Sequence, residues 1–281
     1  MDYKTPIQIK GNVITVIYTK MDETVAKMVL HYYDTPQFNG TLFAVNCLVN
    51  GDDVDIDYRT QYPGYKNYIY YQLNNLYNYP EYVAIEHMNQ FDEIWDCSIN
   101  NIERYPEEAK NKGVFMPLRY IEVQKIEPID EYRYELCFIG VITPSIAEML
   151  SRLSKYWTND YCKIKLLNGY PYSELTEEIK DCKYVIDIPR NSNCGFILNH
   201  TYIFEALCSG KNVIVEVGYG YDNIYSWLVR EYSNIYEVLD IVKEDPVDNS
   251  WVFRRWTENN HNYEEFRQYY MGNKYIQKLD L

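Results

Sequence analysis

The stretch from Cys194 to Gly218 constrains the fold more than any other part of the chain. Asn199 and Thr201 are residue types that cap the start of a helix. The apolar side chains that follow recur at helical spacing on one face, namely Ile203, Phe204, Leu207 and Cys208. Gly210 suits the left-handed end of a helix, and the apolar, β-branched run Asn212–Val217 is typical of a strand covered on both faces. A helix followed at once by such a strand predicts an α/β fold with a parallel sheet.

The first part of the chain alternates strand-like and helix-like segments. Strands are predicted at Asn12–Lys20, Leu42–Leu48, Asn67–Gln72, Phe91–Asp96 and Val114–Leu118, with a hairpin or edge strand at Val54–Tyr58. Helices are predicted at Asp22–Tyr33, at Glu81–Asn89 and from Ile99, where Ser98 is the cap and Pro106 interrupts. This alternation predicts parallel strands joined by crossover helices.

The same alternation restarts after a charged segment, Arg119–Arg133, which contains Pro128 and is predicted to be a linker. Further strands are predicted at Tyr134–Ile139, Tyr161–Leu167 and Lys183–Ile188, and further helices at Pro144–Tyr156, Ser173–Asp181, Ile224–Arg230 and Asn234–Val242. We therefore predict two Rossmann-like domains that face a cleft. Residues 1–120 form the first, residues 121–250 form the second, and residues 251–281 form closing helices.

Charge and cysteine usage narrow the class of protein. The chain carries 41 Asp and Glu against 27 Lys and Arg, a formal net charge of −14. Phosphate-rich partners are held mainly by Lys and Arg, so the acidic balance argues against a nucleic-acid partner. The 7 Cys include no CxxC pair and the 4 His form no cluster with them, so we expect reduced, core-packed thiols and no zinc site.

The sequence also bears on location and source. The first residues, MDYKTPIQIK, lack the apolar segment of a signal peptide, and no run is long and apolar enough to span a membrane. We therefore expect a cytoplasmic protein, in the host cytoplasm if it is viral. The 32 Tyr indicate the codon bias of an AT-rich viral or bacterial genome; an aromatic carbohydrate-binding surface is the alternative interpretation.

Three stretches, taken together, resemble one family. YYQLNNL from Tyr70, FDEIWDCSINNI from Phe91 and VFMPLRY from Val114 are similar to the end of the first domain in a group of GT-B glycosyltransferases. LCFIG, which ends at Gly140, resembles the first strand and glycine turn of the second GT-B domain. CKYVIDIPR and HTYIFEALCSGKNVIVE resemble two further motifs of that domain, and the order and spacing of all these stretches match.

The resemblance implies the GT-B fold, with a nucleotide-sugar donor, UDP- or GDP-linked, bound in the second domain. It implies a hexosyltransferase-like enzyme of undetermined stereochemistry, with an unidentified acceptor (glycan, protein or other) and no bound metal. Glu205 matches the family glutamate that accepts hydrogen bonds from the ribose hydroxyls.

The sequence departs from the family at three positions. The first glutamate of the family's glutamate pair falls at Ile197, the arginine of the helix start is replaced by Tyr202, and the asparagine of the preceding strand is Asp187. These departures indicate a divergent member of the family. A non-catalytic module that binds a nucleotide sugar is therefore an open alternative.

Six residues are the candidates for binding the donor: Gly140, Arg190, Asn199, His200, Thr201 and Glu205. Glycine allows close approach of the backbone, a helix start offers amide groups to phosphate, and an arginine supplies positive charge. Glu216, at the end of its strand, is equally consistent with a ligand contact and with a solvated strand end. An inverting reaction also needs a general base, for which Asp22, Glu23 and Glu86 are candidates that the sequence does not separate.

Two further functions stay open. A viral transferase acting on hydroxylated DNA bases shares this fold, although the acidic balance counts against it. A sugar epimerase of the same architecture would convert a nucleotide sugar with no acceptor.

Overall fold

The computed structural model describes residues 6–46, 57–73, 88–140, 142–156, 163–167, 175–188, 201–217 and 228–259. The chain divides into two compact units: Met1–Leu118 together with Thr257–Leu281, and Arg119–Trp256. The division falls inside the helix α10 (Ser250–Asn259). No described helix is long and apolar enough to cross a membrane.

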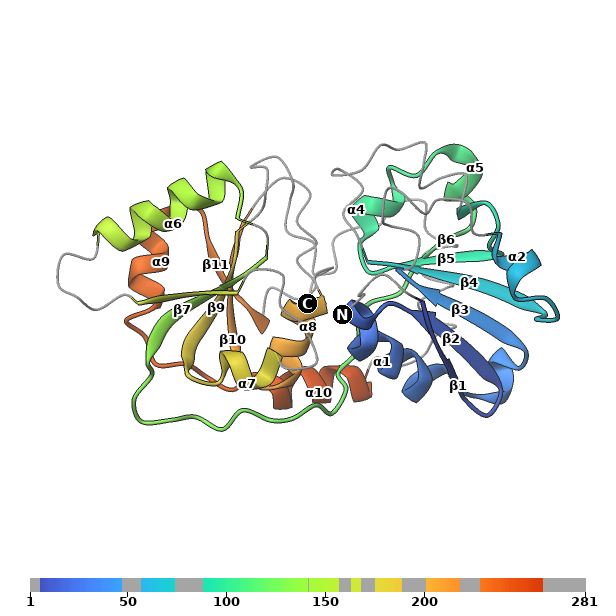
Figure 1. The fold of residues 1–281 in the computed structure, drawn as a ribbon, viewed down its shortest axis with the longest axis horizontal. Coiled ribbons are helices and arrows are strands. Elements are labelled where there is room, and N and C mark those ends of the chain that lie inside the picture. Colours follow the sequence, from blue (N-terminus) through green and yellow to red (C-terminus); the bar gives the residue numbers. More distant parts are fainter. Residues whose placement is uncertain are drawn as a thin grey trace. The chain divides into compact units, whose positions relative to one another are not determined.

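The first unit contains a six-stranded sheet whose strands follow one another in chain order (Figure 1). They are β1 (Ile7–Lys10), β2 (Ile14–Tyr18), β3 (Thr41–Val45), β4 (Asn67–Gln72), β5 (Glu93–Asp96) and β6 (Gly113–Phe115). The edge strand β1 runs antiparallel to β2, and β2 to β6 are parallel. Because these parallel strands keep their chain order across the sheet, the order does not reverse within the described part of this unit.

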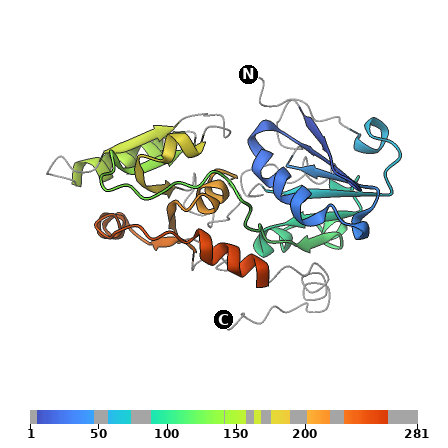
Figure 2. The same cartoon turned by 90° about the horizontal axis from the view of Figure 1, so that it is seen from below.

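Short helices connect these strands, and an aromatic core fills the space beneath the longest of them. The helical segments are η1 (Lys20–Asp22), α1 (Glu23–Tyr33), η2 (Pro36–Phe38), α2 (Tyr58–Gln61), α4 (Ile99–Ile102) and α5 (Glu107–Lys110). Helix α1 packs against β2 and β3 (Figure 2). The ring of Trp95 lies 4.7 Å from that of Tyr33 and 5.1 Å from that of Phe43, centroid to centroid. These buried rings supply much of the apolar area that stabilises the unit.

The second unit contains a five-stranded parallel sheet in which the strand order does reverse. The strands are β7 (Tyr134–Ile139), β8 (Ile164–Leu167), β9 (Cys182–Asp187), β10 (Asn212–Glu216) and β11 (Arg230–Tyr232). Across the sheet they lie in the order β8, β7, β9, β10, β11. The chain thus leaves β7 for β8 on one side and returns to β9 on the other. This 2-1-3-4-5 order is one of the two common arrangements of doubly wound sheets.

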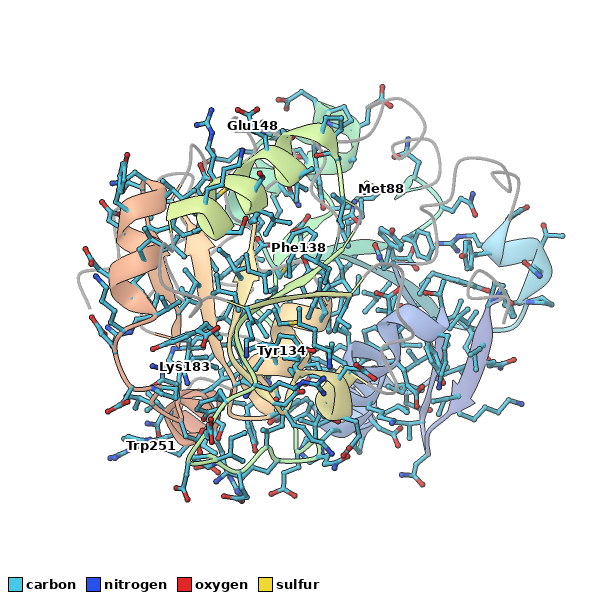
Figure 3. The ribbon with its side chains drawn as sticks, turned by 60° about the vertical axis from the view of Figure 1, so that its left-hand side comes forward. Met88, Tyr134, Phe138, Glu148, Lys183 and Trp251 are labelled. Carbon is cyan, nitrogen blue, oxygen red and sulfur yellow. The ribbon has the colours of Figure 1, made fainter. Side chains whose placement is uncertain are left out.

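Helices cover both faces of this sheet. Helices α6 (Pro144–Tyr156) and α9 (Ile235–Ile241) share one apolar core with the strands, built on Leu136, Phe138, Tyr184, Ile186 and Ile214. Figure 3 shows Phe138 in the interior beneath α6, and Glu148 on the outer side of that helix. Helices α7 (Leu175–Ile179) and α8 (Thr201–Cys208) pack on each other, and α8 also contacts β9 and β10.

The predicted α/β fold class is confirmed, with a mainly parallel sheet in each of two units. That the units face a cleft stays a prediction, as do the boundaries at 120 and 250. The predicted linker contains no helix or strand. Two segment predictions are wrong where the structure describes them. Tyr58 begins α2, because the carboxylate of Asp57 accepts hydrogen bonds from the two amides after it, and Arg230 begins β11 and is not helical. The predicted helix Glu81–Asn89 falls almost wholly outside the described residues.

Candidate functional site

The strand order of the second unit selects one place for a ligand. In open α/β sheets, ligands bind beyond the carboxyl ends of the strands, at the point where the strand order reverses. Here that point lies between β7 and β9, which are neighbours with Phe138 paired to Ile186. Gly140 follows β7, and Asp187 ends β9. Among the described strands of the first unit there is no such reversal, so the rule points to the second unit.

Gly140 has the backbone conformation that its predicted role requires. Its φ is +138°, which side-chain-bearing residues rarely adopt, and its amide donates a hydrogen bond to the carbonyl of Leu167 at 3.0 Å. An added Cβ would meet only the ring of Phe138, at 3.6 Å, which is an ordinary contact. The backbone conformation, and not crowding, therefore favours glycine here. That it contacts a ligand stays a prediction.

The first turn of α8 is tied to the end of β9 by a buried hydrogen bond. The hydroxyl of Tyr202 donates to Oδ1 of Asp187 at 3.0 Å, and both side chains are buried. These are two of the three positions at which the sequence departs from the GT-B motifs. The two departures thus meet in one contact, in which a tyrosine and an aspartate stand where the motifs have an arginine and an asparagine.

Helix α8 starts at Thr201, so its first amides face the same edge of the sheet. The opening turn of a helix has amide groups with no acceptor inside the helix and carries a partial positive charge, which favours an anion. Glu205 lies one turn further on, and only 7% of its surface is exposed. Burial, together with the charge of Glu205, raises the pKa of the neighbouring Cys208 thiol. Glu205 is therefore a buried carboxylate and not a solvated one.

The two strands beyond β9, β10 and β11, contribute two polar side chains whose contact was not predicted from the sequence. Glu216 ends β10 and is paired in register with Tyr232 of β11. The Tyr232 hydroxyl lies 3.4 Å from Oε2 of Glu216 and 3.4 Å from the carbonyl oxygen of Asp187. Burial, followed by the charge of Asp187, raises the pKa of Glu216 against the effect of the tyrosine hydrogen bond. Tyr232 was not among the predicted residues, because no strand was predicted there: a helix was predicted to end at Arg230, where β11 begins. Its place at the end of a parallel strand is the signal.

Three predicted residues, Arg190, Asn199 and His200, lie outside the described residues, and Thr201 is described only by its backbone. Their roles stay predictions. The structure thus brings together Gly140, the start of α8 and Glu205 in one unit, and it adds Asp187, Tyr202, Glu216 and Tyr232 to them.

The candidates for a general base differ in their surroundings. The carboxylate of Asp22 is buried and accepts a hydrogen bond from the Thr19 hydroxyl at 2.8 Å. Burial acts to raise the pKa of Glu23, but hydrogen bonds and charges from Lys20 and Lys27 outweigh it and lower that pKa. Glu86 lies outside the described residues. A carboxylate already neutralised by two lysines is a poor base, so Asp22 is the better of the two described candidates.

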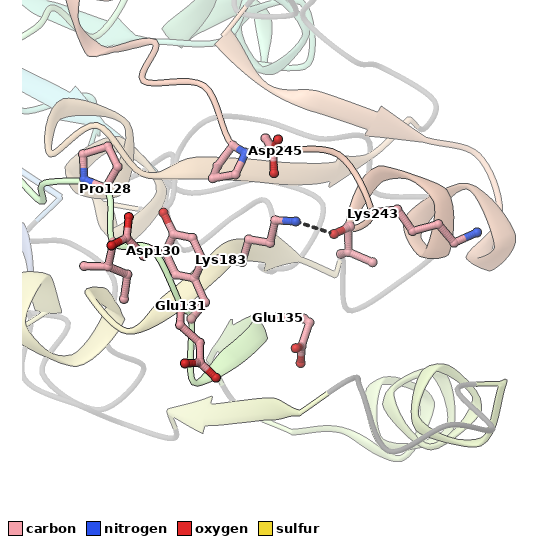
Figure 4. Close-up of a pocket in the computed structure, with 11 residues that line it drawn as sticks. Pro128, Asp130, Glu131, Glu135, Lys183, Lys243 and Asp245 are labelled. Atoms are coloured by element: carbon pink, nitrogen blue, oxygen red, sulfur yellow. Dashed lines mark hydrogen bonds between the residues drawn. The ribbon is translucent and has the colours of Figure 1, made fainter.

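A surface hollow also opens at the opposite edge of this sheet (Figure 4). Glu135 and Lys183, at the amino ends of β7 and β9, line it together with Asp130, Glu131 and Asp245. Its two lysines are both engaged: Lys183 donates to the carbonyl of Val242 at 2.9 Å, and Lys243 pairs with Asp240 at 2.6 Å. Four carboxylates against two engaged lysines disfavour a diphosphate, so this hollow is not the predicted donor site.

The described residues contain no group of three or more His, Cys, Asp or Glu that is placed to hold a metal ion. The cysteines Cys97, Cys137, Cys182 and Cys208 are free and buried, as expected for core-packed thiols.

Comparisons with known proteins give similarities of fold only. No family model matches the chain, and no curated protein matches it. Among solved structures, the chain is similar to Anabaena Alr3699/HepE in complex with UDP and glucose, with a TM-score of 0.46 and 10% identity over 89% of this chain and 80% of that one. The chain is similar to glycosyltransferases of known structure.

Two other similar structures are a T4 phage BGT bound to UDP and Mn²⁺ and a DNA-modifying β-glucosyltransferase with and without uridine diphosphoglucose. Their TM-scores are 0.44 and 0.43, each at 11% identity, over 84% and 90% of this chain and 83% and 93% of theirs. At such low TM-scores and identities, the activity has to be argued from the chain's own residues.

Proposed function

We propose that the chain is a nucleotide-sugar-dependent glycosyltransferase that binds its donor at the carboxyl edge of the second unit's sheet. One observation carries the proposal: Gly140 and the start of α8 follow the two strands, β7 and β9, between which the strand order reverses. A glycine with positive φ and a helix start are the two backbone features that hold a phosphate without many cations. This suits a chain with a net charge of −14.

The same features have a role in the reaction. As the bond between sugar and diphosphate breaks, negative charge builds on the departing phosphate and the sugar becomes oxocarbenium-like. The amides at the start of α8 stabilise the leaving group, because the partial charge there is positive. Arg190 would add a full charge. Glu205 binds the ribose hydroxyls in this proposal, and no metal-dependent step is invoked. The acceptor and the stereochemistry are left open.

The second candidate function is a non-catalytic module that binds a nucleotide sugar. The contact between Tyr202 and Asp187 favours it, because a neutral phenol occupies the position of an arginine and engages a carboxylate. A site with one cation fewer stabilises a leaving diphosphate less than the family motif does.

A thermal-shift series tests the proposal with UDP, GDP, UDP-glucose and GDP-mannose. A ligand that binds only the folded protein at 100 times its Kd stabilises it by about 2.7 kcal/mol. We expect one nucleotide, with its sugar conjugate, to raise Tm. We expect Gly140→Ala and Glu205→Gln to reduce that rise relative to their own unliganded Tm. Asp130→Asn, at the opposite edge of the sheet, is the control and is expected to leave the rise unchanged.

Release of the nucleotide in the presence of candidate acceptors separates the alternatives. Nucleotide release that depends on an acceptor supports a glycosyltransferase. Binding with no release, across glycan, protein and hydroxymethylated DNA acceptors, supports the module. Conversion of the sugar with no acceptor supports an epimerase. If none of the four ligands raises Tm, the donor assignment is wrong.

A further inference from the structure

Glu216 is a carboxylate at the candidate site whose contacts with the described residues leave a binding capacity unused. It ends β10, and β10 lies next to β9, one of the two strands that flank the reversal. The residue before it in the strand, Val215, is paired in register with Asp187 of β9. The side chain is partly exposed, so a ligand at the carboxyl edge has access to it.

The contacts of Glu216 are few. Its one hydrogen-bond partner in the described part of the chain is the hydroxyl of Tyr232, which lies 3.4 Å from Oε2. That phenol has one hydrogen to donate and also lies 3.4 Å from the carbonyl oxygen of Asp187. The second oxygen, Oε1, has no donor among the described residues. An ionised carboxylate only accepts hydrogen bonds, so Oε1 is open to a donor from a ligand.

The surroundings do not compensate the charge of Glu216. No lysine or arginine of the described residues pairs with it, and the charge that raises its pKa, beside burial, is that of another carboxylate, Asp187. Keeping an uncompensated carboxylate partly buried is unfavourable for folding. Such a group at the ligand edge of a sheet is a candidate for function, since strained electrostatics concentrate at binding sites.

The charge also limits what Glu216 can bind. Two neighbouring carboxylates repel a phosphate, so the ligand group that reaches Oε1 is neutral and has hydrogens to donate. In a nucleotide sugar, the hydroxyls of the ribose and of the sugar meet this requirement. Under the proposed function Glu205 binds the ribose, which leaves the sugar.

We propose that Glu216 is a specificity-determining residue of the donor site, where Oε1 accepts a hydrogen bond from a hydroxyl of the transferred sugar and Tyr232 holds the carboxylate in position. The inference rests on the proposed function. It assigns the recognition of the sugar to the β10–β11 side of the reversal, and the recognition of the diphosphate to Gly140 and α8.

The test compares a nucleotide with its own sugar conjugate on each variant. Isothermal titration calorimetry gives Kd for UDP, UDP-glucose and UDP-galactose, and for GDP and GDP-mannose. For Glu216→Gln we expect Kd of the nucleotide to stay within about twofold and Kd of the sugar conjugate to rise about tenfold, because the neutral oxygen of glutamine accepts a weaker hydrogen bond than an ionised carboxylate does. Asp130→Asn is the matched control and should change neither.

Tyr232→Phe provides a second, independent measurement if Glu216→Gln folds poorly. Loss of the hydroxyl removes the group that holds the carboxylate in position. The Kd of the sugar conjugate should therefore rise about threefold relative to the Kd of the nucleotide, which should stay unchanged. A merely structural role would weaken both ligands together and leave the ratio of the two Kd values unchanged.

The outcomes separate the two proposals. If the wild type binds neither nucleotide nor sugar conjugate, the proposed function fails and this inference fails with it. If the wild type binds both, and Glu216→Gln changes both equally or neither, the donor site stands and the role of Glu216 is overturned.

Discussion

The buried carboxylate of Asp96 shows how single contacts hold the end of a strand. It accepts hydrogen bonds from the amide of Ser98 at 2.8 Å, from Nδ2 of Asn101 at 3.1 Å and from the hydroxyl of Tyr105 at 2.6 Å. Burial first, and then the charge of Asp96, raise the pKa of Tyr105 well above its ordinary value, so this phenol remains a donor at all ordinary pH values. The three donors together compensate a charge that would otherwise be too costly to bury.

Tyr105→Phe is therefore expected to destabilise the protein. The change removes one donor and leaves a buried charged acceptor under-satisfied, which costs about 1.5–3 kcal/mol. Urea unfolding followed by circular dichroism measures the loss. Tyr236→Phe, at a largely exposed tyrosine, is the control, expected within about 0.5 kcal/mol of wild type. Equal midpoints for the two variants would contradict the role given to the Tyr105 hydroxyl.

Glu216→Gln is expected to stabilise the protein at neutral and alkaline pH, in contrast to Tyr105→Phe. The pKa of Glu216 in the folded chain lies above that of the unfolded chain, so the folded state binds more protons between the two values. Stability therefore falls as pH rises through that window. The groups that face Glu216 are Asp187, whose charge raises the pKa, and Tyr232, whose hydrogen bond lowers it. Glutamine cannot ionise, so the variant should be more stable than wild type at pH 8.

The extra stability of Glu216→Gln should disappear below about pH 4, where the wild-type carboxyl is mostly protonated in both the folded and the unfolded state. Thermal unfolding of both proteins from pH 3.5 to pH 8 measures it. A variant less stable than wild type at pH 8 would mean that the carboxylate stabilises the fold. A gain in stability combined with loss of sugar recognition is the pattern of a residue kept for function.

At the residue scale, the sequence predicted positions better than partners. Gly140 was predicted from the strand that it follows, and its positive φ suits the assigned role. The contact between Tyr202 and Asp187 was not predicted, although both residues stood out as departures from the motifs. They are 15 residues apart, and their contact depends on how α8 begins over the end of β9. Spacing along the chain does not reveal that geometry.

At the element scale, segments with a strong apolar pattern were predicted closely and edge strands were not. The predicted ranges for β4, β7 and α6 match the structure at both ends, because each has a strong apolar pattern and clear flanking residues. β1 was missed: it is a four-residue edge strand with one half-buried face, so its pattern is weak. β11 is an edge strand of three residues, and its sequence REY follows apolar residues that continue a helical spacing. Pairing to a neighbour, and not local preference, makes both segments strands.

The end of α8 gives a prediction for a whole element. Gly210 follows the helix with φ +88°, and an added Cβ would lie 2.9 Å from Oδ1 of Asp248. That carboxylate is held by the amide of Ser250 at 2.8 Å and by Lys125 at 3.1 Å, so it cannot move away freely. Gly210→Ala should therefore destabilise the protein by about 1–2 kcal/mol from the backbone conformation alone, with more from the contact.

The matched control is Gly64→Ala, at a glycine with φ +98° and open space around its Cβ. This substitution carries the same cost of a positive φ but no steric clash. The difference in stability between the two variants therefore measures the contact with Asp248. Differential scanning calorimetry of both variants measures that difference. If Gly210→Ala is no worse than Gly64→Ala, the carboxylate moves aside and the end of α8 is less fixed than the geometry indicates.

At the scale of the whole molecule, net charge sets how an anionic donor approaches. A nucleotide diphosphate is negatively charged, and the chain carries −14, so their long-range interaction is repulsive. Salt screens this repulsion, with a Debye length that shortens to about 10 Å at 0.1 M. In the proposed donor site the short-range contacts with phosphate are made by the backbone amides at the start of α8, which respond less to salt than lysine or arginine contacts do.

The rate constant for nucleotide association should therefore rise as NaCl increases from 20 to 200 mM. Stopped-flow mixing with a fluorescent UDP or GDP analogue measures it, with the dissociation rate constant as the internal reference, expected to change less. A DNA-binding transferase behaves in the opposite way, because its affinity depends on lysine and arginine contacts that salt weakens steeply. A rate constant that falls severalfold with salt would mean that a local positive field dominates the approach. That result would revive the alternative of a DNA-base transferase, and it would make Arg190, and not the backbone amides, the principal contact of the phosphates.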